Sequence, residues 1–308
     1  MKRVLVTGGA GFIGSHLVEH FRGKVAVRVL DNLRTGRRAN LTGFPVEFVE
    51  GSVLDREAVR AAVRGVDCVF HLAAMVSVVE SMQRPTECVD INVTGYLHVL
   101  EEAAAAGVKK VCFTSSAAVY GNNPAVPKLE TMTPEPRSPY AITKLDGEYY
   151  GAMFTEARKL EVVSLRPFNV FGPRQDPASA YAAALPIFLR QAMAGKPITI
   201  YGDGEQTRDF IHVRDVVAAY AFAATTPGLS GVYNIGYGRQ TTINEIVRTI
   251  LAETGSRSEI RHEPARPGDV QHSVASVAKI CAAGFRASGN LPSALRETVQ
   301  DFRRYVPR

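Results

Sequence analysis

Short apolar runs alternate with longer amphipathic stretches along the first half of the chain. The apolar runs, at 4–6, 25–30, 46–49, 68–72, 110–114 and 162–165, are rich in β-branched residues, as buried strands are. Helical spacing of apolar residues marks 12–21, 56–63, 92–106 and 140–160. Alternating strands and helices predict a parallel sheet covered on both faces. Because crossover connections are right-handed, we expect an α/β fold with a doubly wound, Rossmann-like parallel sheet.

The pattern changes after about residue 171, where prolines and glycine turns divide the chain into short pieces. We expect these pieces to form a smaller C-terminal α/β lobe, made of 174–212 plus 237–308. A helical pattern at 213–225 and an apolar run at 231–235 predict that the chain returns to the large sheet between them. The Rossmann-like domain would then comprise 1–173 plus 213–236.

Composition places the chain among ordinary globular proteins. Of its 308 residues, 46% are hydrophobic and 21% are charged, which argues against disorder and against a small disulfide scaffold. The net charge of +6 comes without a run of basic residues, so we expect no nucleic-acid partner. Four cysteines show neither a C-x-x-C pair nor zinc-ligand spacing, so we expect reduced thiols and no metal site.

The hydrophobic stretches are all too short for a membrane protein. None approaches the roughly 18 consecutive apolar residues that would span a bilayer, and no signal-peptide pattern follows Met1. We therefore expect a cytoplasmic protein without a membrane partner.

A glycine-rich segment, Thr7-Gly8-Gly9-Ala10-Gly11-Phe12-Ile13-Gly14, joins the first strand to the first helix. Glycine permits a tight turn and lets the backbone approach a pyrophosphate, whose charge faces the helix N-terminus. A plain strand–helix turn is the alternative, but such a turn rarely needs four glycines in seven residues. We expect Gly8, Gly11, Phe12, Ile13 and Gly14 to bind a dinucleotide.

An acidic residue follows at the end of the second strand. Asp31, with Asn32 beside it, lies 23 residues after Gly8. A carboxylate at this place accepts hydrogen bonds from the adenosine ribose and repels a 2′-phosphate, which favours NAD over NADP. Three arginines at 34, 37 and 38 weaken that preference. The alternative is that Asp31 only caps a turn.

Tyr140 and Lys144 form a Tyr-x-x-x-Lys pair on a predicted helix. Residues four apart share a helix face, with Cβ atoms about 5–6 Å apart. A free tyrosine has a pKa of about 10, so it is a poor base at neutral pH. A neighbouring ammonium and a bound oxidised nicotinamide would both favour the phenolate, and a pKa of about 7 would need about 4 kcal/mol. Ser116 follows a strand end at the ligand-binding edge of the sheet, where its hydroxyl could hold the reacting oxygen.

These motifs together resemble the extended short-chain dehydrogenase/reductase family, and within it the nucleotide-sugar 4-epimerases. The likeness covers essentially the whole chain. It is carried by 7–14, 31–32, His71-Leu72-Ala73-Ala74, Asn92, 115–121, Tyr140 with Lys144, 166–172, 202–210 and 266–269. The resemblance implies a tightly held NAD, with Tyr140 as the base, Lys144 on the nicotinamide ribose and Ser116 on the sugar 4-oxygen.

The same resemblance implies the remaining contacts of the site. The further NAD contacts expected are Ser52, Val53, Leu72, Ala73, Ala74, Asn92 and Pro167. The nucleotide-sugar contacts expected, beside Ser116, are Ser77, Asn169, Arg208, Arg266, Asp269 and Ser273. A planar guanidinium grips phosphate oxygens bidentately, although surface salt bridges are the alternative for each arginine. Gly51-Ser52 departs from the Gly-Asp of the family, so the adenine amine would lose its acidic partner.

The residues after Ser116 bear on the type of reaction. The related 4,6-dehydratases have an Asp-Glu pair where this chain has Ala117-Ala118, so dehydration would lack its general acid. The glutamate of the related decarboxylases is also missing. We therefore predict a UDP-glucose/UDP-galactose 4-epimerase that oxidises C4 transiently, rotates the 4-keto intermediate and returns the hydride. The alternatives are another NDP-sugar oxidoreductase of the family (reductase, dehydratase or decarboxylase) or a non-catalytic NAD-binding sensor.

One position bears on which sugar is accepted. In this family, the residue seven places after the arginine of Arg-x-Gly-Asp lines the sugar pocket, and counting from Arg266 gives Ser273. A small residue there, like the small-rich segment 180–186, resembles the epimerases that act on N-acetylhexosamines. We therefore expect UDP-GlcNAc and UDP-GalNAc to be accepted too. The alternative is that Ser273 is a surface loop residue.

A homodimer is also expected. The stretches 92–106 and 140–160 correspond to the pairing helices of the family, and both carry apolar residues beyond one stripe. Those residues are Val93, Tyr96, Leu97, Val99, Leu100, Tyr149, Tyr150, Met153 and Phe154. Two such helices from each subunit could form a symmetric four-helix seam. The alternative is that these residues only cover the sheet.

Overall fold

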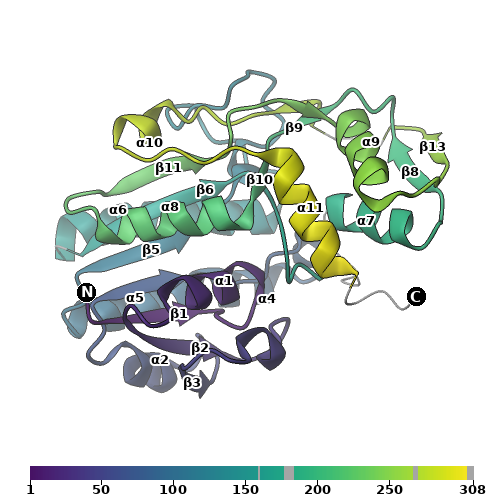
Figure 1. Cartoon of the computed structure of the whole chain (residues 1–308). Coiled ribbons are helices and arrows are strands. Elements are labelled where there is room, and N and C mark those ends of the chain that lie inside the picture. Colours follow the sequence, from purple (N-terminus) through teal and green to yellow (C-terminus); the bar gives the residue numbers. More distant parts are fainter. Residues whose placement is uncertain (159, 177–183, 266–269, 304–308) are drawn as a thin grey trace.

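A seven-stranded parallel sheet forms the centre of the larger half of the molecule (Figure 1). The computed structural model describes residues 1–158, 160–176, 184–265 and 270–303. The strand order is β11-β6-β5-β4-β1-β2-β3. The strands are β1 (Arg3–Thr7), β2 (Ala26–Asp31), β3 (Glu47–Glu50), β4 (Cys68–His71), β5 (Lys110–Thr114), β6 (Glu161–Pro167) and β11 (Gly231–Ile235). The predicted doubly wound α/β fold is confirmed.

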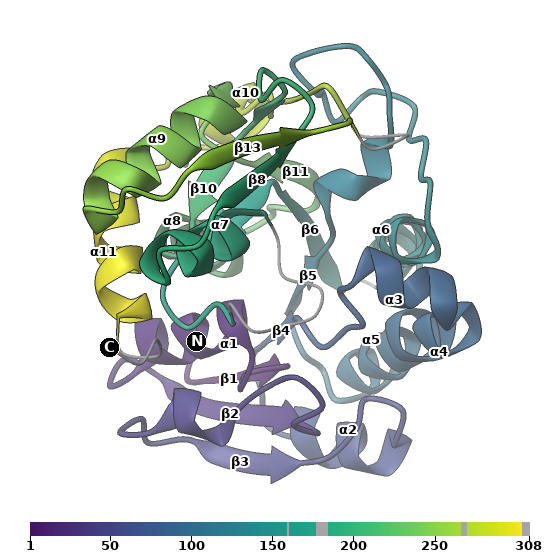
Figure 2. The ribbon, with the colours of Figure 1, turned by 90° about the vertical axis from the view of Figure 1, so that its right-hand side faces the viewer.

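Helices cover both faces of this sheet, because its central strands are apolar on each side. Figure 2 shows α1 (Phe12–Phe21) and α8 (Val213–Thr225) on one side, and α2 (Arg56–Val63), α5 (Gly95–Ala105) and α6 (Pro139–Arg158) on the other. Each side has its own core: Leu17, Phe70 and Tyr220 are buried on the first, and Leu100, Phe113 and Phe154 on the second. The large sheet is thus shielded from water on both faces.

The helix expected over 92–106 begins in a π-helical turn. Two short helices, α3 (Val78–Gln83) and α4 (Pro85–Val89), lead into a single π-helical turn, Asp90–Thr94, before α5 begins. Asn92 lies in this turn, and its side chain bonds to residues outside the helix. Such turns often accompany functional sites in helices.

The smaller lobe is built from short strands and three helices with a separate core. The helices are α7 (Ala184–Met193), α9 (Ile243–Thr254) and α11 (Leu291–Phe302), and Leu189, Ile246 and Phe302 are buried among them. The strand groups are β8 (Ile198–Tyr201) with β13 (Ile260–Glu263), β7 (Asn169–Phe171) with β10 (Phe210–His212), and β9 (Thr207–Arg208) between β12 (Thr241–Thr242) and β14 (His272–Ser273). These strands place the residues predicted to bind sugar.

The chain passes between the two halves more than once. α8 packs on α1 and β11 pairs with β6, so 213–235 lies with the large sheet. The short helix α10 (Ala278–Ala282) also packs on β11 with Ile280 buried, although the sequence places it in the smaller lobe. Among the helices of the described ranges, none is long and apolar enough to cross a membrane.

The apolar faces of the two predicted pairing helices differ. Tyr96, Val99, Leu100 and Phe154 are buried in the core of the same chain, so the expectation that they lie in a subunit interface is wrong for these four. Their rings and methyl groups cover the sheet instead. On α6, by contrast, Tyr149 is 62% exposed and Met153 is 49% exposed.

Candidate active site

The three predicted catalytic residues meet where β5 ends against α6. Tyr140 and Lys144 lie one turn apart on α6, and Ser116 follows the end of β5. The hydroxyl of Ser116 lies close enough to that of Tyr140 to lower its pKa. The Nζ of Lys144 donates to the carbonyl of Thr114 at 2.7 Å and lies 5.8 Å from the ring centre of Tyr140. A base, a hydroxyl and an ammonium therefore converge at the ligand-binding edge of the sheet.

Burial determines the electrostatics of this cluster. It raises the pKa of Tyr140, and the neighbouring hydroxyl of Ser116 opposes that change only in part. Burial also lowers the pKa of Lys144 to about 8, because the ammonium is desolvated beside Phe113. The expectation that Lys144 and a bound oxidised nicotinamide together favour the phenolate of Tyr140 stays a prediction, because among the protein groups burial has the largest effect on this pKa.

The glycine-rich turn between β1 and α1 is built so that no side chain fits. Gly8 has a φ of +70°, and a Cβ there would lie 2.8 Å from the amide nitrogen of Ala73. A Cβ on Gly14 would lie 2.2 Å from the carbonyl oxygen of Gly8. Helix α1 starts after Gly11, and no side chain caps its first N–H groups. These amides, including those near Phe12 and Ile13, suit the pyrophosphate of a dinucleotide.

Asp31 ends β2 beside this turn. Its carboxylate accepts hydrogen bonds from the amides of Ala10 and Leu33, both at 2.8 Å, so it caps the turn as the alternative view of this residue held. Each carboxylate oxygen has a second lone pair, so these bonds are compatible with a ribose contact. The neighbouring Asn32 is similarly used by a turn, since it accepts from the amide of Arg34 at 3.1 Å.

The three arginines that weakened the NAD preference all have protein partners. Arg34 bonds to Glu80 at 2.8 Å and to Glu87 at 2.9 Å. Arg37 pairs with Asp176 at 2.5 Å, and the guanidinium of Arg38 lies over the Phe48 ring. A 2′-phosphate would have to compete with these partners, so their arrangement favours NAD.

The end of β4 lies against the glycine turn. The amides of Leu72 and Ala73 both donate to the hydroxyl of Thr7 at 3.2 Å, while that hydroxyl contacts Nδ1 of His71 at 2.9 Å. Burial lowers the pKa of His71 to about 3, so this imidazole is neutral. Because the Thr7 hydroxyl already accepts from two amides, its own proton is the one donated to Nδ1. Thr7 therefore holds the segment that continues to Ala74 close to Gly8.

Other predicted cofactor contacts surround this centre. The hydroxyl of Ser52 accepts from the amide of Leu54 at 3.1 Å, and Val53 is buried near Gly95. Pro167 closes β6. In the described part of the chain, no group of His, Cys, Asp and Glu side chains is arranged to hold a metal ion.

Asn92 and Ser77 play structural roles in this arrangement. The amide group of Asn92 accepts from the amide of Met75 at 2.7 Å and donates to the hydroxyl of Thr143 at 3.0 Å. Asn92 is buried, so it ties the 75–77 segment to α6 rather than offering a free group to a cofactor. Ser77 caps α3 by accepting from the amide of Glu80, and its hydroxyl proton is still available to a ligand.

The predicted sugar-binding residues lie on adjoining short strands. Ser273 of β14 is the register partner of Arg208 of β9. Asn169 of β7 donates to the carbonyl of Asp209, the residue after Arg208, at 3.3 Å. These three predicted contacts are therefore brought together. Arg266 and Asp269 lie outside the described residues, as do 180–183.

Sequence reasoning missed a buried set of residues behind Ser116. Ser115 donates to Glu148, and Arg166 bonds to both oxygens of that carboxylate at 2.7 Å and 2.6 Å. Glu148 lies eight residues after Tyr140 on the same helix, so its spacing from the Tyr-x-x-x-Lys pair was visible in the sequence. A charged residue on an inward helix face was the available indication.

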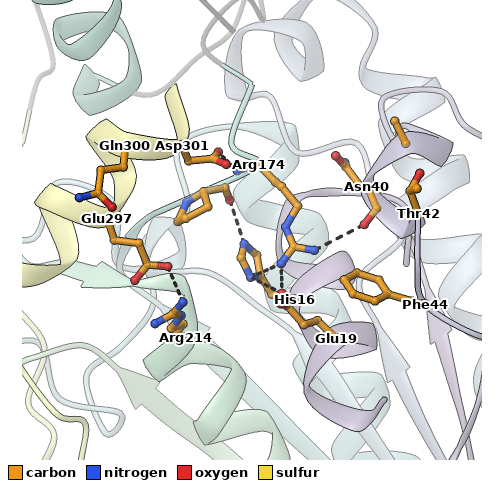
Figure 3. A pocket seen from close by; sticks show the side chains of 12 residues that line it. His16, Glu19, Asn40, Thr42, Phe44, Arg174, Arg214, Glu297, Gln300 and Asp301 are labelled. Carbon is orange, nitrogen blue, oxygen red and sulfur yellow. Dashed lines mark hydrogen bonds and ion pairs between the residues drawn. The ribbon is translucent and has the colours of Figure 1, made fainter. Parts of the chain in front are cut away.

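A cavity of about 460 Å³ lies apart from the catalytic cluster, where α11 meets α1 (Figure 3). His16 donates from Nε2 to the carbonyl of Pro173 at 2.9 Å and accepts from Arg174 at 2.6 Å. Arg214 pairs with Glu297 across the cavity at 2.6 Å. These bonds connect the C-terminal helix to the large half, and among the described residues none of the predicted catalytic groups lines this space.

Comparison with known proteins identifies the family. The sequence pattern of the NAD dependent epimerase/dehydratase family matches residues 4–236. This chain belongs to that family. It is 38% identical over 278 residues to the UDP-glucose 4-epimerase of Mycolicibacterium smegmatis, covering 88% of each chain. It is also 37% identical over 274 residues to a UDP-N-acetyl-alpha-D-glucosaminuronate decarboxylase of Bacillus cytotoxicus, covering 85% of this chain and 84% of the other.

A solved structure gives a similar result. The UDP-N-acetylglucosamine 4-epimerase of Methanobrevibacter ruminantium, in complex with UDP-N-acetylmuramic acid, superposes with a TM-score of 0.96. The two chains are 37% identical, and the match covers 99% of each. The predicted family, fold, NAD cofactor and UDP-sugar 4-epimerase class are confirmed.

Proposed function

We propose that this chain is an NAD-dependent 4-epimerase that acts on UDP-hexoses and on their N-acetylated counterparts. The observation that carries the proposal is the cluster of Ser116, Tyr140 and Lys144 at the end of β5. Ala117 and Ala118 follow Ser116 directly, so no acid stands at this place in the chain to expel water from the sugar. With bound NAD as the hydride acceptor, this set suffices to remove the proton of a sugar hydroxyl and the hydride of the carbon that bears it.

The protein groups have separate tasks in this reaction. The phenolate of Tyr140 takes the proton of the sugar 4-hydroxyl, while the hydroxyl of Ser116 holds the same oxygen. NAD supplies the acceptor and later the donor of the C4 hydride. Lys144, anchored on Thr114, stands beside Tyr140 and offers its remaining N–H groups to the nicotinamide ribose. The 4-keto sugar then rotates and presents its other face.

The glycine turn and the end of β4 support the placement of NAD. The uncapped first turn of α1, after Gly11, suits the pyrophosphate. Gly8 and Gly14 allow the close backbone packing that shapes this turn, because a side chain on either would collide with backbone. Asp31 stands at the end of β2, where the adenosine ribose is expected.

Acceptance of N-acetylated sugars rests on Ser273. This residue is partly buried beside Arg208, which we propose binds the diphosphate. A serine here leaves the volume that a tyrosine ring would fill, and its hydroxyl suits the polar atoms of an acetamido group. A sugar without that group only forfeits contacts, worth roughly 1–3 kcal/mol, so UDP-glucose and UDP-galactose remain substrates.

The test compares kcat/KM for the plain and the N-acetylated sugar pairs. We expect wild type to convert both, and Ser273→Tyr to lose the N-acetylated pair selectively. Ser293→Tyr, at an exposed position on α11, serves as the control. Negligible turnover of the N-acetylated pair by wild type would refute the broader specificity. Absence of turnover with every UDP-sugar would instead leave the sensor alternative, because a sensor binds NAD without converting sugar.

The similarity to a decarboxylase suggests a second candidate reaction, decarboxylation. A decarboxylase would release carbon dioxide from a UDP-uronic acid, whereas an epimerase would not. We propose epimerisation because Ala117 and Ala118 replace the acidic residues that other reactions of the family use. Incubation with UDP-glucuronic acid and its N-acetylated analogue, followed by detection of carbon dioxide, distinguishes the two.

We infer a homodimer formed through α6 and the neighbouring α3 and α4. Exposed apolar side chains gather on these three helices: Val78, Val79, Met82, Val89, Ile142, Tyr149 and Met153. A patch of this kind favours a partner surface, and a two-fold axis would place it against itself. Light scattering at micromolar concentration tests this, with Met153→Lys expected to shift the mass toward the monomer.

We also propose a cytoplasmic location. All four cysteines are free, and Cys68, Cys88 and Cys112 are buried. Free thiols are compatible with a reducing compartment. Cell fractionation tests the location directly.

A further inference from the structure

A buried polar network runs from the catalytic helix toward the smaller lobe. It consists of Ser115, Glu148, Arg166, Tyr120 and Asn234, which we call the buried network. All five residues are at most 5% exposed. The reaction as proposed above uses none of them, so their role needs a separate explanation.

One end of the network is an ion pair. Nε and Nη2 of Arg166, on β6, donate to the two oxygens of Glu148 at 2.7 Å and 2.6 Å. This bidentate geometry is the strongest form of the pair and fixes the carboxylate in one orientation. The hydroxyl of Ser115 donates to the same carboxylate. Glu148 thus connects α6 both to β6 and to the end of β5.

The other end reaches the segment that carries Ser273. Arg166 donates from Nη1 to the hydroxyl of Tyr120 at 2.8 Å, and that hydroxyl donates to Oδ1 of Asn234 at 2.7 Å. The side-chain amide of Asn234 donates to the carbonyl of Lys128 at 2.8 Å. Lys128 in turn pairs by its backbone with Val274 and Ser276.

The contacts of α6 with the end of β5 form a regular set. Tyr140, Lys144 and Glu148 follow one another at intervals of four on one face of α6. Three consecutive residues at the end of β5 face them: Thr114 accepts from Lys144, Ser115 donates to Glu148, and the Ser116 hydroxyl lies near that of Tyr140 and lowers its pKa. Glu148 is buried and is the only one of the three that carries a bidentate ion pair to β6, so we infer that its position determines how α6 lies on the strand.

We propose that the buried network is a positioning device, which sets α6 against β5 so that Tyr140 meets Ser116, and which links this register to the 274–276 segment of the smaller lobe. A buried ion pair is weak evidence for stability, because desolvation of two charges offsets much of their attraction. A positioning role explains why the pair reaches both the catalytic hydroxyls and the sugar side. The inference rests on the proposed function.

Ser115→Ala tests the catalytic end, because it removes one hydroxyl and leaves the ion pair intact. We expect kcat to fall about tenfold to a hundredfold, because a small displacement of reacting groups has effects of that order. KM for the UDP-sugar should stay within twofold. The acid limb of the kcat profile should move to higher pH, because the nearby Ser116 hydroxyl, which lowers the pKa of Tyr140, would be displaced.

Thr298→Ala is the matched control for Ser115→Ala. It also removes a buried hydroxyl, one that donates to the carbonyl of Ala294 within α11. We expect its kcat and pH profile to equal those of wild type. A kcat of Ser115→Ala within twofold of wild type, or an equal loss in Thr298→Ala, would overturn the proposal.

Tyr120→Phe tests the link to the smaller lobe. It removes the hydroxyl shared by Arg166 and Asn234, and we expect KM for the UDP-sugar to rise about fivefold with NAD content unchanged. Tyr233→Phe is the control, since Tyr233 precedes Asn234 on β11 and belongs to the core on the opposite face of the sheet. An unchanged KM in Tyr120→Phe would refute the link. Turnover by wild type in the same assay tests the proposed function, and only the ratio of variant to wild type tests the network.

Discussion

The two halves of the site are held in place in different ways. On the cofactor side, β1, β2 and β4 are neighbours in one continuous parallel sheet, and the turn after β1 owes its shape to glycine. On the sugar side, β9, β12 and β14 are two residues long each. So few ladder hydrogen bonds cannot hold a strand by themselves.

Buried polar side chains take over where the strands are short. The carboxylate of Asp209, which is 0% exposed, accepts from the amides of Tyr237 at 2.8 Å, Gly238 at 2.9 Å and Ala275 at 3.1 Å. These three amides belong to segments that flank Arg208 and Ser273. The cofactor side should therefore be sensitive to added volume, and the sugar side to the loss of a hydrogen-bond acceptor.

Tyr140→Phe should have the largest effect and leave both halves intact. Loss of a general base typically reduces the rate by about 10²–10⁴-fold. NAD content and binding of the UDP-sugar should not change, because the hydroxyl contributes to neither half of the site as a structural group. Steady-state kinetics, NAD content of the purified protein and calorimetry with UDP-sugar measure the three quantities.

The control is Tyr149→Phe, because Tyr149 is 62% exposed on the same helix. More than a tenth of wild-type turnover in Tyr140→Phe would show that another group is the base.

Gly14→Ala should damage the cofactor side alone. The new Cβ would lie 2.2 Å from the carbonyl oxygen of Gly8, and relieving this contact requires backbone movement. Overpacking of this kind costs about 3 kcal/mol of unfolding free energy. We expect NAD content to drop more than tenfold, measured by absorbance after denaturation.

Gly23→Ala separates backbone strain from collision. Gly23 has a φ of +71° but no heavy atom within 4 Å of its would-be Cβ. Its substitution should cost about 1 kcal/mol through the left-handed conformation, with NAD content unchanged. Equal NAD loss in both variants would mean that the close approach at Gly14 is not what shapes the site.

Asp209→Asn should damage the sugar side alone. An amide nitrogen cannot accept the hydrogen bonds that a carboxylate oxygen accepts, so at least one buried N–H would lose its partner. Such a loss costs about 2 kcal/mol of unfolding free energy. We expect KM for the UDP-sugar to rise about tenfold and NAD content to stay at the wild-type level. Asp203→Asn, exposed on the same lobe, is the control. A fall in NAD content of Asp209→Asn would show that the two halves do not respond separately.

The same contrast explains what the sequence could predict of the fold. Apolar periodicity located α1 and α2 at their observed bounds, 12–21 and 56–63, because each covers the sheet with one apolar face. It did not locate the π-helical turn that precedes α5, where Asn92 bonds to Met75 and Thr143, which are distant in sequence. It also missed the two-residue strands, which are too short to show any period.

Prediction of the site had a similar limit. Ser116, Tyr140 and Lys144 were found because their chemistry is local in sequence or belongs to a known motif. Glu148 and Asp209 were missed as organising residues, because their partners become neighbours only when the chain folds. The sequence also did not show which apolar residues of α6 are exposed. Phe154 and Met153 are both apolar, and only their helix faces distinguish the buried residue from the exposed one.

The smallest effect concerns the joint between the halves, where His16 connects α1 to Pro173 and Arg174. Burial, aided by the charge of Arg174, lowers the pKa of His16 from 6.5 to about 3. Because the folded pKa is depressed, the neutral imidazole contributes stability that is fully present above pH 6.5 and is lost as the pH falls toward 3. The loss approaches about 1.4 kcal/mol for each pH unit. His16→Gln keeps a donor and an acceptor but does not titrate, so its unfolding free energy should fall less steeply between pH 6.5 and 4.5. Urea unfolding at half-unit pH steps measures both slopes.

Other buried groups also change the unfolding free energy in this pH window. The lowered pKa values of His71 and His212 make it fall as the pH falls, whereas the raised pKa of Asp209 acts in the opposite direction. Since these groups are common to both proteins, they cancel in the difference, and equal slopes would mean that the pKa of His16 is the same in the folded and unfolded states.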